Sequence, residues 1–296
     1  MPALLLGEAL VDLVCERPDV YVPHPGGAVA NVALVAARSG AAVELAGGAG
    51  ADPWGERLLR YLESAGVGTR WFSLREGAQT PVAFVTLDER GEPHFQIYGE
   101  DIATVVGALG ERVEEAVQGC SALFVSSNTL VAEDERAVTH RAREQALALG
   151  RPVLFDPNLR LHRWPNATRA AAESRELVPG TWLVRCNAAE GEVLTGEPDP
   201  VAAAEALLAA GAEHVIVTLG SEGALLRGGG MRLDVPGVPA RTVDTTGAGD
   251  TLMGVLLARC AASAFYGPTL AHALPEAVAR AARATEHFGA HPSRRD

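Results

Sequence analysis

Short apolar runs alternate with longer segments rich in alanine, leucine, arginine and glutamate along most of this chain. Such runs are typical of strands buried on both faces, and the segments between the later runs have the composition of helices. Two of these helices, 133–150 and 199–211, are expected to stop at Gly150 and Gly211. The order predicts an α/β fold of Rossmann type, with a mostly parallel central sheet flanked by helices. The predicted strands are 3–14, 121–127, 152–158, 181–187 and 214–220.

One region departs from this alternation. Residues 80–99 contain two strand-like runs around the turn sequence DERGEP, which predicts a β-hairpin. Such a hairpin is either an ornament at the sheet edge or a lid over the crevice at the carboxyl ends of the strands, where these sheets bind ligands. We favour a small β lid, built from segments near 10–24 and 70–100. No linker or repeat divides the chain, so 1–296 is expected to form a single domain.

Composition and charge exclude several classes of function. The 296 residues have a formal net charge of −12, so no binding to nucleic acid or to an anionic membrane is expected. No apolar stretch approaches the roughly 18 residues of a membrane span, and the first residues predict a strand rather than a signal peptide. The cysteines lie far apart, which fits a reducing compartment, and we expect a cytoplasmic protein without disulfides or a zinc site. They are Cys15, Cys120, Cys186 and Cys260.

The chain contains no lysine, and all 25 of its basic residues are arginine. Codon use in a GC-rich genome is the simplest cause of this bias. Its chemical consequence is to exclude a Walker A phosphate loop, a protein-kinase active-site lysine and a Schiff-base lysine. Any bound phosphate must therefore be held by backbone N–H groups, by arginine side chains or by a metal ion.

The segment VDTTGAGDTLMGVLLARC, residues 243–260, predicts a strand end, a tight loop and a helix. Gly247 and Gly249 let the backbone turn tightly and a ligand approach, while the loop N–H groups and the first helical turn favour negative charge. Asp250 is therefore a candidate general base, which takes a hydroxyl proton while the loop stabilises a transferring phosphoryl group. A helix N-cap is the alternative role for Asp250. A Rossmann dinucleotide loop is excluded, because Leu252 stands where its third glycine belongs.

The same segment resembles the C-terminal signature of the ribokinase-like carbohydrate kinases, the PfkB family. The N-terminal signature of that family is similar to PGGAVANVALVAARSG at 25–40 and GGAGADPWGERL at 47–58. The sequences FDPNLR, CNAAE and VTLGSEGALL follow in family order, so the resemblance covers nearly the whole chain. It implies a ribokinase-like fold and an enzyme that transfers the γ-phosphoryl group of ATP to a sugar hydroxyl.

The resemblance also implies roles for individual residues. Asp250 takes the role of the base, with Gly247, Ala248 and Gly249 as its anion hole. Asp12 matches a carboxylate that binds two adjacent sugar hydroxyls, and a GG-x-x-x-N turn supplies an amide that both donates and accepts hydrogen bonds. A solvated aspartate at a strand end and a helix N-cap asparagine are the alternatives. The residues of that turn are Gly26, Gly27 and Asn31.

Matches to a nucleotide site lie in the second half of the chain. Asn187 and Glu190 match an N-x-x-E motif, in which the glutamate acts near Mg²⁺ through water and the asparagine lies close to the phosphates. Mg²⁺ usually keeps several waters, so one protein carboxylate is enough. A T-x-G-x-x-G nucleotide-binding turn matches at Thr218, Gly220 and Gly223.

Two further pairs of residues follow from the resemblance. Asn158 and Arg160, in the sequence DPNLR, are expected near the sugar or the phosphates, with a surface arginine as the alternative. Arg160 is the best candidate for a side-chain cation in the site. Asp244 and Thr246 match a monovalent-cation site, for K⁺, that is found in some relatives.

The expected sugar depends on where the chain departs from the family pattern. Family members often have aspartate where Ala51 stands and an arginine after the lid tyrosine, where this chain has Gly99, Glu100 and Asp101. An acidic lid disfavours an acidic sugar, and GEALVDL and DPNLR look most like fructokinases, so fructose is expected. The alternatives are a 2-keto-3-deoxygluconate kinase, a ribokinase or a nucleoside kinase and, from another class, a non-catalytic sugar- or nucleotide-binding relative. The resemblance also implies a homodimer joined through the lids.

Overall fold

The computed structural model describes residues 1–88, 91–98, 106–110 and 112–291. Within them, the main sheet has nine strands in the order β13-β12-β11-β10-β9-β8-β1-β4-β5. The strands from β11 to β5 run parallel, and β12 and β13 extend the sheet by antiparallel pairing. The predicted mostly parallel sheet is therefore confirmed. Its strands are β1 Ala3–Leu6, β4 Val43–Gly50, β5 Phe72–Arg75, β8 Leu123–Ser126, β9 Val153–Asp156, β10 Leu183–Asn187, β11 His214–Thr218, β12 Gly223–Gly228 and β13 Met231–Pro236.

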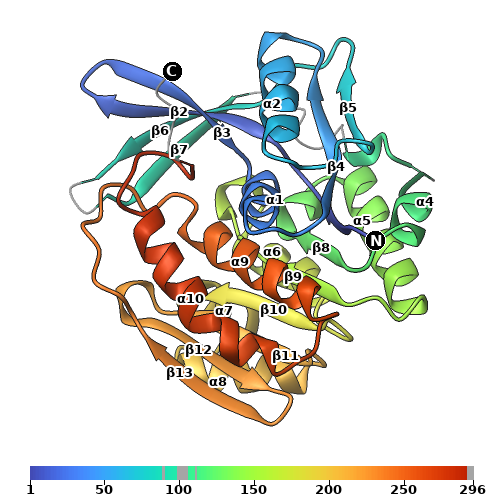
Figure 1. The fold of residues 1–296 in the computed structure, drawn as a ribbon, viewed down its shortest axis with the longest axis vertical. Coiled ribbons are helices and arrows are strands. Elements are labelled where there is room, and N and C mark those ends of the chain that lie inside the picture. Colours follow the sequence, from blue (N-terminus) through green and yellow to red (C-terminus); the bar gives the residue numbers. More distant parts are fainter. Residues whose placement is uncertain (89–90, 99–105, 111, 292–296) are drawn as a thin grey trace.

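Helices cover both faces of this sheet, so the main body has three layers (Figure 1). One face packs against α1 Ala28–Arg38, α2 Pro53–Ser64, α9 Ala248–Ala262 and α10 Thr269–Ala284. The other packs against α4 Arg112–Gln118, α5 Glu133–Ala148, α6 Ala167–Arg175, α7 Ala188–Thr195 and α8 Pro200–Ala209. No helix among the described residues is long and apolar enough to cross a lipid bilayer.

The predicted helix stops are confirmed. Helix α5 ends two residues before Gly150, and α8 ends two residues before Gly211. The backbone φ angles of these glycines are 63° and 105°, a region that side chains with a β-carbon rarely adopt. Each glycine thus reverses the chain and directs it into the next strand of the sheet.

A second, four-stranded sheet packs beside the main body in the order β3-β2-β6-β7. Strands β6 and β7 pair antiparallel, which confirms the predicted hairpin. Strand β5, which follows Trp71, belongs instead to the edge of the main sheet. The strands of this small sheet are β2 Leu10–Arg17, β3 Val20–Gly26, β6 Val82–Leu87 and β7 Pro93–Tyr98.

The prediction of one strand over 3–14 is wrong, because this segment contributes to both sheets. Strand β1 ends at Leu6 in the centre of the main sheet, and β2 begins at Leu10 in the small sheet. Between them Gly7 lies directly against α1, where a β-carbon would be 2.4 Å from Cγ2 of Val29. The apolar pattern continues across this junction because both strands are buried, so composition alone does not reveal the change of sheet.

Candidate active site

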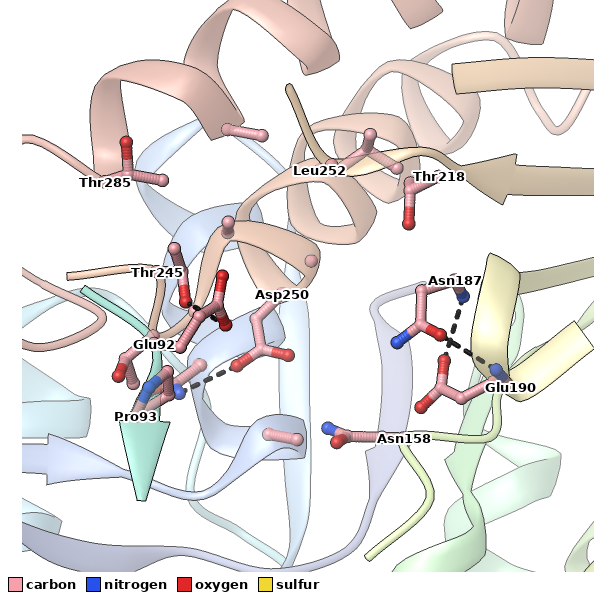
Figure 2. Close-up of a pocket in the computed structure, with 18 of the residues that line it drawn as sticks. Glu92, Pro93, Asn158, Asn187, Glu190, Thr218, Thr245, Asp250, Leu252 and Thr285 are labelled. Atoms are coloured by element: carbon pink, nitrogen blue, oxygen red, sulfur yellow. Dashed lines mark hydrogen bonds between the residues drawn. The ribbon is translucent and has the colours of Figure 1, made fainter. Parts of the chain in front are cut away.

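A cavity of about 1270 Å³ lies between the small sheet and the carboxyl ends of the parallel strands (Figure 2). Pockets for one small molecule typically measure about 300–1,000 Å³, so this one has room for two ligands. We call the part of the cavity around Asp12, Asn31 and Asp250 its small-sheet end. We call the part around the carboxyl ends of β10 and β11 its β10 end. The β10 end comprises Arg185, Asn187, Glu190 and Thr218, and Asp156 lies next to Arg185 outside the cavity lining.

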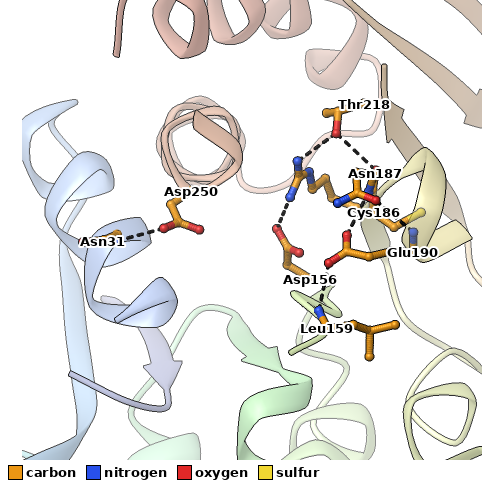
Figure 3. Close-up of polar contacts among 9 residues, drawn as sticks. Asn31, Asp156, Leu159, Cys186, Asn187, Glu190, Thr218 and Asp250 are labelled. Carbon is orange, nitrogen blue, oxygen red and sulfur yellow. Dashed lines mark hydrogen bonds and ion pairs between the residues drawn. The ribbon is translucent and has the colours of Figure 1, made fainter. Parts of the chain in front are cut away.

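Asp250 lies in the first turn of α9 and lines the cavity. The N-cap of this helix is Gly247, so the alternative role of Asp250 as an N-cap is wrong. Asn31 likewise lies inside α1 rather than at its cap, and its Nδ2 donates a hydrogen bond of 2.9 Å to Oδ2 of Asp250 (Figure 3). The two family signatures, 219 residues apart, therefore meet through their side chains.

Asp12 lies in the middle of β2, in register with His24 and Ala83, and not at a strand end as predicted. Its side chain rests on Gly26, where a β-carbon would be 2.3 Å from Oδ2. Gly26 itself does not line the cavity, whereas Gly27 does. The glycine pair thus makes room for a buried carboxyl group.

The carboxyl groups of Asp12 and Asp250 both have raised pKa values, of about 7. Burial is the main cause at each site, because it removes water from the charged form. The charge of Asp250 further raises the pKa of Asp12, while the hydrogen bond from Asn31 opposes the shift at Asp250. A carboxylate with a pKa near neutrality is suited to accept a proton during catalysis.

The two glycines of the loop are needed for different reasons. Gly247 has a φ of 75°, and a β-carbon there would also strike Ala290 at 2.4 Å. Gly249 has no positive φ, but a β-carbon there would lie 2.5 Å from Nη1 of Arg185. Gly247 therefore supplies backbone freedom, and Gly249 supplies space.

At the β10 end, Asn187 caps α7. Its Oδ1 accepts from the N–H of Glu190 at 2.8 Å, and Oε2 of Glu190 accepts from the N–H of Asn187 at 2.9 Å. The other carboxylate oxygen accepts from the N–H of Leu159 at 2.8 Å (Figure 3). A carboxylate has about four lone-pair sites, so Glu190 retains acceptors for the waters of a hydrated Mg²⁺.

Thr218 ends β11, and Gly220 and Gly223 form the turn into β12. Both glycines have positive φ angles, of 59° and 110°, and a β-carbon on Gly223 would lie 2.0 Å from the carbonyl of Val235. All three predicted residues of this turn line the cavity, and Figure 2 shows Thr218 on the side where Asn187 lies. A side chain has no room at Gly223, whereas at Gly220 space is open and only the positive φ favours glycine.

Asn158 and Arg160 follow β9 and line the cavity. Asn158 is buried, with a φ of 43°, and the guanidinium of Arg160 lies 5.4 Å from the ring centre of Phe95 in β7. Burial raises the pKa of Asp12 and of Asp250, and the charge of Arg160 opposes both shifts. The arginine is therefore half-buried in the cavity lining and lies against the small sheet.

Asp244 is fully buried outside the cavity lining. Its carboxylate oxygens accept from the backbone N–H groups of Thr246 and Gly289, both at 2.8 Å. The buried hydroxyl oxygen of Thr246 has no hydrogen-bond partner among the described residues. Oxygen ligands of this kind suit a hard cation, so the pair fits the predicted K⁺ site.

The prediction of the sugar depended on Ala51 and on residues 99–101. Gly99, Glu100 and Asp101 lie outside the described residues, and Ala51 does not line the cavity. The tip of the β6–β7 hairpin instead contacts the loop before Gly247: Oγ1 of Thr245 donates to Glu92 at 3.0 Å (Figure 2).

Several polar residues of the cavity were missed by sequence reasoning. Glu8 accepts hydrogen bonds from the N–H of Ala28 at 3.0 Å and from Nδ2 of Asn128 at 3.1 Å, and Arg163 binds Oδ1 of the same asparagine at 3.2 Å. Arg185 donates to Asp156. The available signal was a charged residue inside or directly after a predicted buried strand, as in the sequences TWLVRCN, PVLFDPN and ALLLGEAL.

Comparison with known proteins agrees with this arrangement. The family model described as pfkB family carbohydrate kinase matches residues 5–295. Fructokinase-2 of Solanum lycopersicum is 32% identical over 262 residues, covering 86% of this chain and 80% of that protein. Fructokinase-1 of Oryza sativa subsp. japonica is 34% identical over 265 residues, covering 86% and 81%.

Solved structures give the same result. A double-mutant fructokinase from Vibrio cholerae O395, bound to fructose, ADP and potassium ion, has a TM-score of 0.87 at 29% identity, covering 98% of this chain and 93% of that one. A fructokinase from Xylella fastidiosa with bound ATP has a TM-score of 0.85 at 28% identity, with the same coverage. The fold, the glycine loop with its aspartate and these relatives lead to one assignment: the chain belongs to the pfkB family of carbohydrate kinases.

Proposed function

We propose that this protein is an ATP-dependent fructokinase. The observation that carries the proposal is the position of Asp250, whose carboxyl group has a pKa of about 7 and follows the glycine loop in the first turn of α9. One helical turn thereby holds both the carboxylate that can accept a proton and the backbone N–H groups that can stabilise negative charge. Phosphoryl transfer to a hydroxyl needs both.

The proposed reaction begins with the sugar bound at the small-sheet end. Asp12 accepts hydrogen bonds from two of its hydroxyls, and Asn31 holds Asp250 by its hydrogen bond. Asp250 takes the proton of the attacking hydroxyl, whose oxygen bonds to the γ-phosphorus of ATP as the bond to the β-phosphate oxygen breaks. The N–H groups of the loop Gly247–Ala248–Gly249 stabilise the transferring phosphoryl group, and ADP leaves from the β10 end.

Two cations complete the proposal. Glu190 would hold Mg²⁺ through water, and Mg²⁺ would neutralise phosphate charge. Asp244 and Thr246 would hold K⁺ behind the glycine loop, where the hydroxyl oxygen of Thr246 is buried without a partner. Asn187, Thr218, Gly220 and Gly223 would contact ATP, and Asn158 and Arg160 the sugar or the phosphates.

Fructose is the proposed sugar, since the similar plant and bacterial proteins are named fructokinases. A second candidate is 2-keto-3-deoxygluconate, because Arg160 and Arg163 both line the cavity and can pair with a sugar carboxylate. Coupled ADP-release assays on a panel of sugars at low salt, comparing kcat/KM, test the proposal. We expect the highest kcat/KM for fructose. A higher kcat/KM for 2-keto-3-deoxygluconate would make that acid the substrate in place of fructose. No turnover of any sugar would refute the proposal that the protein is a sugar kinase.

A homodimer joined through the small sheets is also proposed. Strand register puts Tyr21, Phe84 and Tyr98 on the face opposite Asp12, where the rings stack edge to face with centres 5.3 and 5.4 Å apart. Tyr98 is 58% exposed, so this aromatic row is open to a second copy of the chain.

Sedimentation experiments test the dimer. Tyr98→Glu should give monomers, whereas the control Tyr266→Glu, at a tyrosine that is 66% exposed elsewhere on the surface, should not. A wild-type monomer would contradict the proposal.

A further inference from the structure

Arg185 is an unusual residue for its place in the fold. It lies within β10, a central strand of the main sheet, and only 9% of its surface is exposed. Buried arginines are rare and need partners for their charge. Nη1 donates to Oδ2 of Asp156 at 3.0 Å, and Nη2 donates to Oγ1 of Thr218 at 2.8 Å. The side chain thus ties together the ends of three adjacent strands.

The guanidinium also touches the glycine loop. A β-carbon on Gly249 would lie 2.5 Å from Nη1, 2.7 Å from Nη2 and 2.8 Å from Cζ. The whole planar group of Arg185 is therefore packed against the backbone of the loop. Since Gly249 has no positive φ, the close approach of the arginine is what excludes a side chain there.

The charge of this group is permanent. Burial alone would lower the pKa of Arg185, but the carboxylates of Asp156 and Glu190 outweigh burial and raise the pKa above its ordinary value. Among the described residues, the arginines that line the cavity are Arg160, Arg163 and Arg185. Arg160 lies over Phe95 and Arg163 binds Asn128, so Arg185 is the one in contact with the loop.

We propose that Arg185 is a positioning residue that stabilises the transferring phosphoryl group through the loop Gly247–Ala248–Gly249. A fixed positive charge beside the loop adds to the attraction of its N–H groups for negative charge, and it needs no rearrangement during the reaction. In a chain without lysine, this arginine provides the cation that backbone groups alone lack. The inference rests on the proposed kinase function and extends it by one residue.

The simpler alternative is that Arg185 only neutralises Asp156. Three variants separate the two roles: Arg185→Met, Arg185→Lys and the double variant Asp156→Asn/Arg185→Met. The single Met variant leaves a buried carboxylate unpaired and is expected to lose stability, whereas the double variant leaves no buried charge unpaired and should recover its melting temperature. The double variant therefore keeps the test valid if the single one does not fold.

For the proposed role, kcat should fall about 10²-fold or more in Arg185→Met and in the double variant, with the KM for the sugar unchanged. Arg185→Lys, which keeps the charge, should recover part of kcat. A double variant with wild-type kcat would overturn the proposal, and so would a change confined to KM.

A second readout does not depend on the identity of the sugar. ADP with aluminium fluoride imitates the transferring phosphoryl group, and calorimetry can compare its binding with that of ADP alone. Arg185→Met and the double variant should weaken the aluminium fluoride complex and leave the affinity for ADP unchanged. Equal weakening of both ligands would overturn the role of Arg185, whereas wild-type protein that binds both ligands but turns over no sugar would count against the kinase function alone.

Discussion

At the small-sheet end of the cavity, carboxyl groups have few hydrogen-bond partners, whereas the carboxyl group of Glu190 at the β10 end is well paired. No described residue donates a hydrogen bond to the carboxyl of Asp12, and Asp250 receives one, from Asn31. Glu190 by contrast accepts two backbone N–H groups. Asp156 is intermediate: its Oδ2 accepts from Arg185, but its Oδ1 has no partner among the described residues, and burial raises its pKa to about 6. Both aspartates of the small-sheet end have a pKa of about 7.

This difference in hydrogen bonding corresponds to two roles for a buried carboxyl group. A carboxylate that accepts several backbone hydrogen bonds is held in one place and stabilises the fold, as Glu190 does in the capping box of α7. A carboxylate with open acceptors costs stability but can bind hydroxyls or accept a proton. We therefore expect substitutions at the small-sheet end to reduce activity without destabilising the fold, and substitutions at the β10 end to affect stability as well.

The largest effect is expected for Asp250→Asn. Loss of the general base should lower kcat by about 10²–10⁴-fold, while calorimetry still detects binding of sugar and ATP. Asp199→Asn is the matched control, because Asp199 caps α8 by accepting from the N–H of Ala202, as an asparagine also can. Turnover of the Asp250 variant close to wild type would show that another group accepts the proton.

The second prediction concerns pH. Asp250 must be ionised to act as a base, and its pKa is about 7, so kcat/KM should rise about tenfold per pH unit below that value and level off above it. Steady-state rates between pH 5 and 9, in buffers of constant ionic strength, measure this limb. A flat profile across this range would mean that proton transfer to Asp250 does not limit the reaction of the free enzyme.

The third prediction is a gain of stability from Asp12→Asn. Because the pKa of Asp12 is raised from 3.8 to about 7, the folded protein holds a proton that the unfolded chain has released, and stability falls as pH rises through this window. The uncharged variant avoids this loss, so its free energy of unfolding should exceed that of wild type by about 4 kcal/mol at pH 8 and should come close to it near pH 4. Thermal unfolding at both values measures the difference, and the KM for the sugar should rise. An equal gain at both pH values would contradict the role of charge.

The smallest effect is expected for Glu190→Gln at the β10 end. One of the two backbone N–H groups held by the carboxylate would face an NH₂ group instead, which should cost about 1 kcal/mol of stability. The concentration of Mg²⁺ needed for half-maximal activity should also increase. Glu197→Gln, at an exposed glutamate just beyond α7, is the control and should change neither quantity. Unchanged stability would place Glu190 with the open carboxylates of the small-sheet end.

Local structural elements could be predicted from the sequence where a short pattern of neighbouring residues determines them. Buried strands, the helix stops at Gly150 and Gly211 and the hairpin at 80–99 each depend on neighbouring residues, and the structure confirms them. The single strand predicted over 3–14 failed because Gly7 transfers the chain between two sheets that are both buried. An apolar pattern reports burial, not which sheet buries the residue.

The sequence alone determined which residues are candidates for chemistry, because glycine loops and their flanking side chains form recognisable short motifs. Tertiary structure decided how these motifs act together. Asn31 reaches Asp250 across 219 residues, and Arg185, which belongs to none of the motifs, packs against Gly249 from β10. Contacts between distant segments depend on how sheets and helices pack, and the pKa of a carboxyl group depends on the burial that results.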